Sequence, residues 1–516
     1  MESLIDRINQ LAACAGDLNF SILGAVYLYP GRFLRLSGLQ YALVMLGGVL
    51  WIGVGAVAAW KLFRPRLTAA MKRGDAAVSR ELFAAFSLIY VLSGLYVTLS
   101  YPPTTDEPHY LTIAESILKD GDIMVANNYE ARDYTAFFPS AEIDPHAVIT
   151  PDGRMYSQHT LGLPVLVLPF YALAGRWGVS VLLSVLAAAF AAWVYLLCRK
   201  EGIRKESCAV TAVLTGITCP LYFASNLVFT EVPAAVLSAA ALLNMGSPWI
   251  PAAAGSALPW LHPRYALIAL GIAFLSWLRA KDRVRLAATW LVCGTISGLA
   301  FFTIYRGEAL ASVLNVLTEQ YPARLESLTA GVLAGVSLGN PIVGLLGKLF
   351  DREFGVIPYS PWLLVLFAGL GALSGGKFGR HRIFLWGVGA YLLATSAFRN
   401  WGGSAFPGRT LIPVLPFIMP YVALGVDWAS EKAWRRKVLG ALASVSVFMS
   451  IMMTVCPVLR YTSGRDWMAA KLGSFWSVMP FNWFPSFSRN ALLSSLIGAT
   501  IVSVVVMAVR AGEQKR

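Results

Sequence analysis

Long apolar runs alternate with short polar segments along most of the chain. Thirteen of these runs predict transmembrane helices, although several fall short of the ~20 residues that a span prefers. The predicted spans are residues 40–62, 82–101, 179–198, 207–226, 232–246, 249–261, 263–279, 286–305, 357–373, 383–398, 410–428, 438–458 and 490–510. The pattern therefore predicts an all-α polytopic membrane protein with about 13 transmembrane helices.

The charges of the connecting segments predict which ends of the spans face the cytoplasm. Segments on one side hold 24 of the 42 Lys and Arg residues. Because basic residues collect on the cytoplasmic side of membrane proteins, that side is predicted to be cytoplasmic. These segments are 61–81, 199–206, 279–285, 377–382, 432–437 and 510–516. The net charge of +14 thus reflects topology, and no nucleic-acid partner is predicted.

The composition narrows the class of protein further. Hydrophobic residues make up 57% of the chain and charged residues only 14%, whereas average soluble domains carry roughly 25% charged residues. The six cysteines are scattered, and they form neither a disulfide framework nor the spacing of a metal site. These features exclude an ordinary soluble enzyme, a secreted domain behind a signal peptide, a coiled coil and a disordered scaffold.

Longer polar segments divide the chain into three predicted parts. An N-terminal segment, residues 1–39, contains a stretch compatible with an interfacial or a re-entrant helix. A first transmembrane module covers residues 40–305 and includes an outer loop, residues 102–178. A C-terminal module covers residues 306–516 and has outer loops at 306–356, 399–409 and 459–489. The last loop is rich in aromatic residues, as expected of a helix lying at the membrane interface.

The polar part of the first outer loop, residues 102–160, holds the largest group of chemically active side chains. It carries ten of the 28 acidic residues and three of the five histidines. A Pro-Pro pair ends the preceding span, and an amphipathic helix is expected over residues 108–119. Asp106 and Glu107 would then stand at the mouth of the helix bundle. They either cap this helix or take part in chemistry at the membrane surface.

Four strings of the sequence, in order, resemble the GT-C superfamily of membrane glycosyltransferases that use polyprenyl-phosphate sugars. That superfamily includes protein O-mannosyltransferases and the lipid A aminoarabinose transferase. The strings are SYPPTTDEPHYLTIAESILKDGD (100–122), MYSQHTLGLPVLVLPFYALAG (155–175), NLVFTEVPAAVL (226–237) and PWLHPRYALIAL (259–270). Further along, DREFGVIPYSPW (351–362) and WGGSAFPGR (401–409) are similar to strings of uncharacterised bacterial members.

The resemblance implies a GT-C-like bundle and a role for each matching residue. Asp106, the first acid of its pair, corresponds to the catalytic residue of that superfamily, and Glu107 and Glu231 would orient the acceptor or the sugar. His159 stands where relatives have a lysine that contacts the donor phosphate. The expected donor-phosphate ligands are His159, His262, Arg264 and Arg409, and the expected substrate contacts are His109, Tyr110 and Tyr156.

The implied reaction moves a sugar from a polyprenyl-phosphate donor to an acceptor hydroxyl, with inversion at the anomeric carbon. A carboxylate deprotonates the acceptor, and cations at the same depth stabilise the departing phosphate. The expected location is the periplasmic face of a bacterial inner membrane. The expected partners are the donor, an unidentified glycan, lipid or protein acceptor, and membrane lipids. The site is assigned no metal and no certain cofactor.

Other interpretations of the same residues remain open at this stage. Glu231 is also explained as a solvated acid just above the hydrocarbon, and Arg264 and Arg409 as interfacial anchors. For the whole chain, the alternatives are a lipid-linked glycan transporter or flippase, an O-antigen-ligase-like enzyme, and a non-catalytic assembly or scaffold protein. A transporter would be expected to place charged residues at mid-span positions of many helices, and these are scarce in the sequence.

A divalent metal is a further alternative for the first outer loop. His109 with Asp106, or His146 with Asp144, would supply imidazole and carboxylate ligands, which suit several divalent ions. Pairs two or three residues apart are nevertheless frequent by chance in so polar a loop. The sequence alone therefore assigns no metal ligand set.

Overall fold

The computed structural model describes residues 38–138, 142–149, 153–304, 340–372, 382–397, 402, 406–461, 465–466, 469, 477–487 and 494–503. The N-terminal stretch with the expected interfacial helix lies outside the described residues, as do residues 306–339 of the predicted outer loop 306–356 and parts of the predicted outer loops 399–409 and 459–489. Nearly all of the regular structure in the described part is helical, and its two short strands form one hairpin.

Among the described residues, six helical stretches are long and apolar enough to cross a membrane. They are Leu46–Arg73, Asp75–Leu99, Gly162–Lys200, Arg283–Ile304, Arg409–Ser430 and Ala433–Val455. Each of them overlaps one of the thirteen predicted spans. The predicted class of all-α membrane protein is therefore confirmed, whereas the predicted number of about 13 spanning helices is not.

The first module contains both full-length and short helices. Its elements are α4 (Gly38–Arg73), α5 (Asp75–Ser100), α6 (Glu107–Lys119), α7 (Ala126–Glu130), η1 (Asp133–Ala136), β1 (Ala147–Ile149), β2 (Met155–Ser157), α8 (Gly162–Lys200), α9 (Lys205–Ile217), α10 (Leu221–Ala224), α11 (Glu231–Leu243), α12 (Trp249–Leu261), η2 (Pro263–Tyr265), α13 (Ala266–Arg279) and α14 (Arg283–Ile304). The predicted span 207–226 is thus broken into α9 and α10. Pro220 lies at the break, where it can donate no backbone hydrogen bond to a continuous helix.

The predicted C-terminal module contains two of these six stretches together with several shorter elements. Its elements are α17 (Asn340–Phe350), η3 (Pro361–Leu364), α18 (Val365–Ala372), α19 (Arg382–Ala397), η5 (Arg409–Val414), α20 (Leu415–Ser430), α21 (Ala433–Val455), η6 (Pro457–Arg460) and η7 (Pro480–Trp483). A further described helical stretch covers Ser494–Ser503. Helix α17 falls within the segment predicted as the outer loop 306–356, and it packs against α19.

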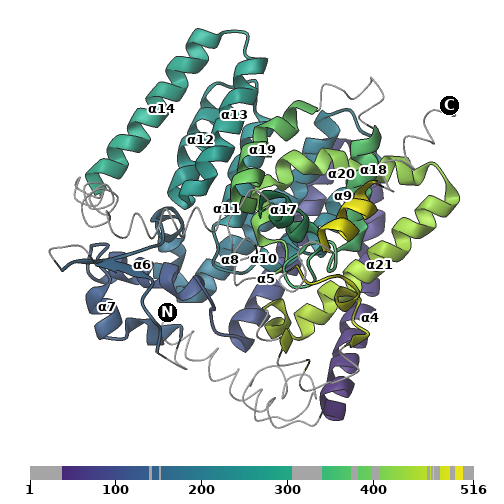
Figure 1. Ribbon diagram of the computed structural model, residues 1–516, viewed down its shortest axis with the longest axis horizontal. Coiled ribbons are helices and arrows are strands. Elements are labelled where there is room, and N and C mark those ends of the chain that lie inside the picture. Colours follow the sequence, from purple (N-terminus) through teal and green to yellow (C-terminus); the bar gives the residue numbers. More distant parts are fainter. Residues whose placement is uncertain are drawn as a thin grey trace.

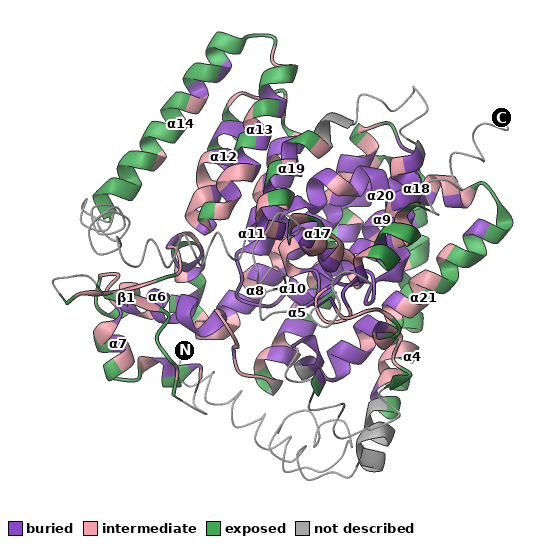
Figure 2. Cartoon of the chain, in the orientation of Figure 1, coloured by how far each residue is buried: buried purple, intermediate pink, exposed green. Residues whose placement is uncertain are grey.

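The helices pack around α8, which contacts α5, α9, α11 and α20. In Figure 1, α14 and α12 lie at one side of the molecule and α21 and α4 at the other, with α8, α11 and α20 between them. The central helices are mostly buried, whereas α14 and much of α4 are exposed along their length (Figure 2). The exposed faces of α4 and α14 carry large apolar side chains such as Trp51 and Leu291. Such continuous apolar surface is what lipid tails are expected to cover.

Ion pairs link several of the basic segments to neighbouring segments at one end of the bundle. Arg199 pairs with Asp75 at 3.0 Å, and Arg279 pairs with Glu201 at 3.9 Å. Arg204 donates a hydrogen bond to Asp427 at 2.5 Å. The segments 61–81, 199–206 and 279–285, together with the end of α20, therefore meet at this end of the helices.

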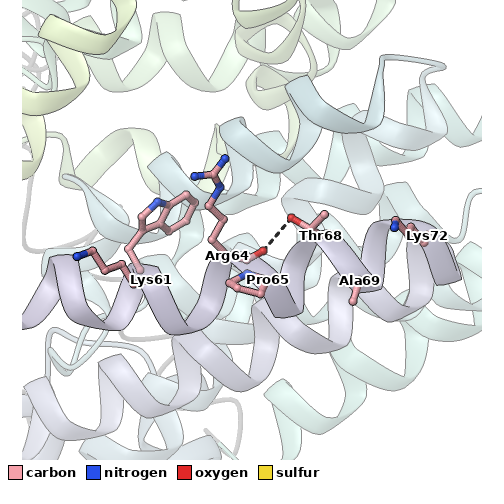
Figure 3. A pocket seen from close by; sticks show the side chains of 7 residues that line it. Lys61, Arg64, Pro65, Thr68, Ala69 and Lys72 are labelled. Carbon is pink, nitrogen blue, oxygen red and sulfur yellow. Dashed lines mark hydrogen bonds between the residues drawn. The ribbon is translucent and has the colours of Figure 1, made fainter.

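A pocket on α4 belongs to one of these basic segments. Its seven lining residues are Trp60, Lys61, Arg64, Pro65, Thr68, Ala69 and Lys72. Figure 3 shows the hydroxyl of Thr68 donating to the carbonyl of Arg64 along the helix, at 2.9 Å. The lining comes from a single helix face and includes none of the residues that the sequence singled out for chemistry.

The first outer loop leads back into the bundle through the kinked helix α8. Ala174 and Gly175 leave the helical conformation, and Gly175 has φ 54°, a left-handed value that glycine adopts easily. The part of α8 before this kink corresponds to the predicted juxtamembrane helix, and the part after it to the predicted span 179–198. Gly162 begins α8 so close to α12 that a Cβ atom there would lie 2.4 Å from the carbonyl oxygen of Trp260.

Candidate functional site

Four charged residues from separate parts of the chain meet at the end of the bundle that carries the first outer loop. Asp106 precedes α6 and Glu231 begins α11, while Arg264 lies in η2 and Arg409 begins η5. Packing of α11 against η5, and of α12 against both α11 and η2, brings these element ends together. We refer to Asp106, Glu231, Arg264 and Arg409 as the acid–arginine cluster.

Arg409 joins the two acids of the cluster. Its Nη2 donates to Oδ2 of Asp106 at 2.7 Å, and its Nε donates to Oε1 of Glu231 at 2.7 Å. Nη2 of Arg264 donates to the same Glu231 oxygen at 2.6 Å. The cluster thus forms one continuous chain of charge-assisted hydrogen bonds, which are stronger than those between neutral groups.

The sequence left open two interpretations without a catalytic role, namely Asp106 as a helix cap and Glu231 as a solvated acid above the hydrocarbon. The geometry bears on both. The side chain of Asp106 makes no capping hydrogen bond to α6. Glu231 is fully buried rather than solvated above the hydrocarbon. Because a buried carboxylate is costly unless it is paired, the two arginines account for its presence there.

Aromatic side chains support the two guanidinium groups. The guanidinium of Arg409 lies 4.0 Å from the centre of the Phe229 ring, and that of Arg264 lies 5.1 Å from the Tyr265 ring. The Tyr265 hydroxyl is 3.2 Å from Nη2 of Arg264 and 3.0 Å from the hydroxyl of Thr230. These contacts hold the guanidinium planes in place, as cation–π pairs do.

The cluster is partly open to solvent and retains hydrogen-bonding capacity. The side chain of Asp106 is 27% exposed and that of Arg264 is 22% exposed. Nε of Arg264 and Oε2 of Glu231 are buried and have no hydrogen-bond partner within the described protein. A donor and an acceptor therefore remain available beside a carboxylate that solvent can reach.

The protonation state of Asp106 follows from its surroundings. Burial raises the pKa of Asp106, but the positive charge of Arg409 and its hydrogen bond outweigh this effect, and the net pKa lies below the ordinary value of 3.8. Asp106 is therefore a carboxylate at neutral pH, which is the form that can accept a proton.

The imidazoles predicted to contact the donor phosphate are neutral in this environment. Burial lowers the pKa of His159 to about 4, although the charge of Asp106 opposes the shift. Burial, followed by the charge of Arg264, lowers the pKa of His262 to about 4. His262 accepts a hydrogen bond on Nδ1 from the backbone N–H of Arg264 at 3.2 Å, so it positions that arginine.

The hydrogen-bond partners of Glu107 lie outside the acid–arginine cluster, although Glu107 follows Asp106 directly. Its Oε1 accepts from the backbone N–H of Val228 at 2.8 Å, and its Oε2 accepts from the backbone N–H of Thr104 at 2.9 Å. The hydroxyl of Tyr461 lies 3.5 Å from Oε2. These contacts make Glu107 an anchor of the loop, whereas the resemblance implied that it orients the sugar or the acceptor.

The three histidines of the first outer loop form a second group, which we call the three-histidine cluster. One ring nitrogen from each of His109, His146 and His159 lies within 4.8 Å of the others. The rings of His109 and His146 stack at 4.0 Å between centroids, and His159 lies 5.4 Å from His109. Nδ1 of His109 is 2.7 Å from the hydroxyl of Tyr129.

The predicted substrate contacts fall into two places. Tyr110 is buried and lies 4.7 Å, between ring centroids, from His159. Tyr156 lies on β2, opposite Val148 on β1. Tyr110 therefore packs against the histidines, whereas no contact places Tyr156 in the acid–arginine cluster.

Sequence reasoning missed the grouping of the three histidines and the part played by Tyr129. The pairs considered were local, Asp106 with His109 and Asp144 with His146, whereas the observed grouping depends on the β-hairpin. The string Pro-Asp-Gly at 151–153, between Val-Ile-Thr and Met-Tyr-Ser, is a turn signal that indicates this hairpin. Aligning its two arms would have placed His146 near His159.

Comparisons of the chain with protein-family models, with curated proteins and with solved structures each find no match.

Proposed function

We propose that this membrane protein is a GT-C-type glycosyltransferase that moves a sugar from a polyprenyl-phosphate donor to an acceptor hydroxyl. The observation that carries the proposal is the hydrogen bond from Arg409 to Asp106 within the acid–arginine cluster. It places a partly exposed, ionised carboxylate next to guanidinium groups at one end of an apolar helix bundle. This is the combination that such a transfer requires.

Asp106 acts as the base in the proposed reaction. A lipid-linked phosphate is already a competent leaving group, so the enzyme must deprotonate the acceptor hydroxyl as the new bond forms. The acceptor oxygen attacks the anomeric carbon from the face opposite the phosphate, its proton passes to Asp106, and polyprenyl phosphate departs. The product has the inverted configuration at the anomeric carbon.

The arginines stabilise the leaving phosphate. Arg264 is partly exposed and has an unpartnered Nε, so it can donate hydrogen bonds to phosphate oxygens. Arg409 stays between the two acids and sets their positions. Glu231, whose Oε2 also lacks a partner, is suited to accept a hydrogen bond from a sugar hydroxyl.

The membrane context fits a lipid-linked donor. The acid–arginine cluster lies at the end of the bundle with the first outer loop, and the linked basic segments lie at the ends of α8 and α13 that point away from it. Under the positive-inside rule, the cluster then faces the periplasm of a bacterial inner membrane. A lipid donor would approach laterally between helices, and a glycan, lipid or protein acceptor from the aqueous side.

The test follows polyprenyl phosphate release by the full chain in detergent or nanodiscs, with a panel of short-chain polyprenyl-phosphate sugars. We expect release with one sugar, and a loss of ~10²–10⁴-fold in rate for Asp106→Asn, the range typical of a general base. The matched control is Asp144→Asn, which makes the same change at an exposed acid in the same loop.

Three results would contradict the proposal. Full activity of Asp106→Asn would show that Asp106 is not the base. An equal loss of activity in Asp144→Asn would show that the effect is not specific to the acid–arginine cluster. If an acceptor panel supports no release with any sugar while the protein binds intact lipid-linked oligosaccharide, the transporter or ligase interpretation is favoured instead.

A further inference from the structure

We infer that His109, His146 and His159 bind one divalent transition-metal ion, with Zn²⁺ as the best-suited ion. The three-histidine cluster brings one nitrogen of each ring within 4.8 Å of the others. Imidazole is a preferred ligand of zinc, copper, nickel and iron, and three histidines with an open fourth position form a common zinc site.

The hairpin explains why residues from three places meet. Antiparallel pairing sets Ala147 opposite Ser157, so His146 and His159 lie just beyond the same end of the two strands. The backbone N–H of Gln158 donates to the carbonyl of His146 at 2.8 Å and extends the pairing toward this end. His109, in the first turn of α6, faces the pair. The register of the hairpin therefore brings His146 and His159 to the same place.

One nitrogen of His109 and one of His159 are also available to coordinate a metal ion. Nδ1 of His109 is hydrogen-bonded to the hydroxyl of Tyr129, so Nε2 of His109 remains available to coordinate an ion. Metal-binding histidines commonly use their second nitrogen in this way, and the partner fixes the orientation of the ring. Nε2 of His159 is buried and has no hydrogen-bond partner within the described protein. A metal ion would satisfy it.

The exposed residue His146 is where a metal ion can reach the three-histidine cluster. His109 is buried and His159 is half-buried, whereas His146 is exposed, so an ion can reach the cluster from the aqueous side. Nitrogen ligands lie ~2.0–2.1 Å from zinc, and three such nitrogens stand closer together than 4.8 Å. Of the three rings, the exposed imidazole of His146 has the most room to adjust to these distances when the ion binds.

The role of the ion rests on the proposed function, although its binding does not. The acid–arginine cluster contains two carboxylates and two guanidiniums, so its net charge is zero. An incoming donor phosphate therefore gains no net positive charge from these four groups. A divalent ion on the three-histidine cluster would supply that charge in the first outer loop, which also carries Asp106.

The binding test uses tag-free, full-length protein in detergent, stripped with a chelator and titrated with Zn²⁺ and with Co²⁺. We expect one equivalent to bind, and Co²⁺ to give visible absorption of low-symmetry, nitrogen-ligated cobalt. His146→Ala should weaken Zn²⁺ affinity at least ~10-fold, and His159→Ala similarly, because each removes a ligand. His262→Ala, which removes a histidine outside the three-histidine cluster, is the control and should bind normally.

The readout is binding, so it separates this proposal from the transferase proposal. Zn²⁺ binding that is unchanged in both His146→Ala and His159→Ala, or no binding by the wild type, would overturn the metal site even if glycosyl transfer is found. Conversely, specific binding in the absence of any transferase activity would support the site and contradict only its proposed role. His146 is exposed, so its replacement leaves the packed core intact.

Discussion

Arg409 and Asp106 are 303 residues apart in the sequence, yet Nη2 of the arginine lies 2.7 Å from Oδ2 of the aspartate. The bond joins the start of η5, in the predicted C-terminal module, to the segment that precedes α6, in the predicted first module. The first outer loop is thereby fastened to a helix that enters the most deeply buried part of the bundle.

The coupling between these two residues can be measured. Asp106→Asn, Arg409→Gln and the double variant form a double-mutant cycle, and thermal or denaturant unfolding in detergent gives the free energy of unfolding for each. Residues in direct contact are expected to couple by ~0.5–3 kcal/mol. Additive effects, within about 0.5 kcal/mol, would mean that the bond contributes nothing to holding the loop.

The two neighbouring acids should respond differently to substitution. Glu107→Ala removes the acceptor of two backbone N–H groups, those of Val228 and Thr104, and each buried N–H left unpaired costs ~1–3 kcal/mol. We expect a clear fall in the melting temperature of Glu107→Ala. Asp106→Asn should lose glycosyl transfer with a smaller fall in melting temperature, because asparagine keeps a side-chain oxygen that can accept a hydrogen bond from Arg409. If Asp106→Asn lost mainly stability and Glu107→Ala lost mainly glycosyl transfer, the roles assigned to the two acids would be wrong.

Arg264 is expected to act on the donor phosphate. Hydrogen bonds to charged groups are worth ~1.5–3 kcal/mol, which corresponds to ~10–150-fold. Arg264→Ala should therefore lower kcat/KM for the lipid donor by about this factor, while Arg264→Lys keeps the charge and loses the planar hydrogen bonding. Arg279→Ala changes an arginine at the opposite end of α13 and should leave donor kinetics unchanged. Equal effects at both positions would refute the phosphate assignment.

The packing of α13 against α19 provides a prediction that does not depend on function. A Cβ atom on Gly271 would lie 1.7 Å from the backbone carbonyl oxygen of Gly387. Gly271→Ala must push the two helices apart, and overpacking of this kind costs ~1–3 kcal/mol. Gly294→Ala on α14 meets nothing within 4 Å and should be neutral. Comparable melting temperatures for the two variants would show that these helices do not pack as described.

The sequence predicted the parts of the fold that depend on long apolar runs. The spans around α5, α14 and α21 are continuous helices that overlap their predicted ranges, and α14 follows its range most closely. Sequence analysis was less successful where helices are short or broken. Pro220 breaks an apolar run whose hydropathy alone looks continuous, and α17 follows a glycine-rich stretch and is too short to register as a span. Hydropathy averages over a window, so it cannot detect such local breaks.

The candidate site, like the fold, was predictable from the sequence only in part. Asp106, Glu231, Arg264 and Arg409 could each be picked out because charged residues stand out between apolar runs. Their mutual contacts depend on how helix ends meet in three dimensions, and no local spacing encodes that. The three-histidine cluster was missed for a related reason, since it depends on the register of a hairpin rather than on a helical interval.

The anchor at Glu107 has a mechanical consequence. Val228, which donates to Glu107, lies only three residues before Glu231, so one short connection into α11 carries both the anchor point and the buried acid. A shift of the start of α11 would therefore displace Glu231 and, through Glu107, the segment that carries Asp106. Arg409 binds both carboxylates from η5. The spacing between the two carboxylates is thus set twice, once by this connection and once by Arg409.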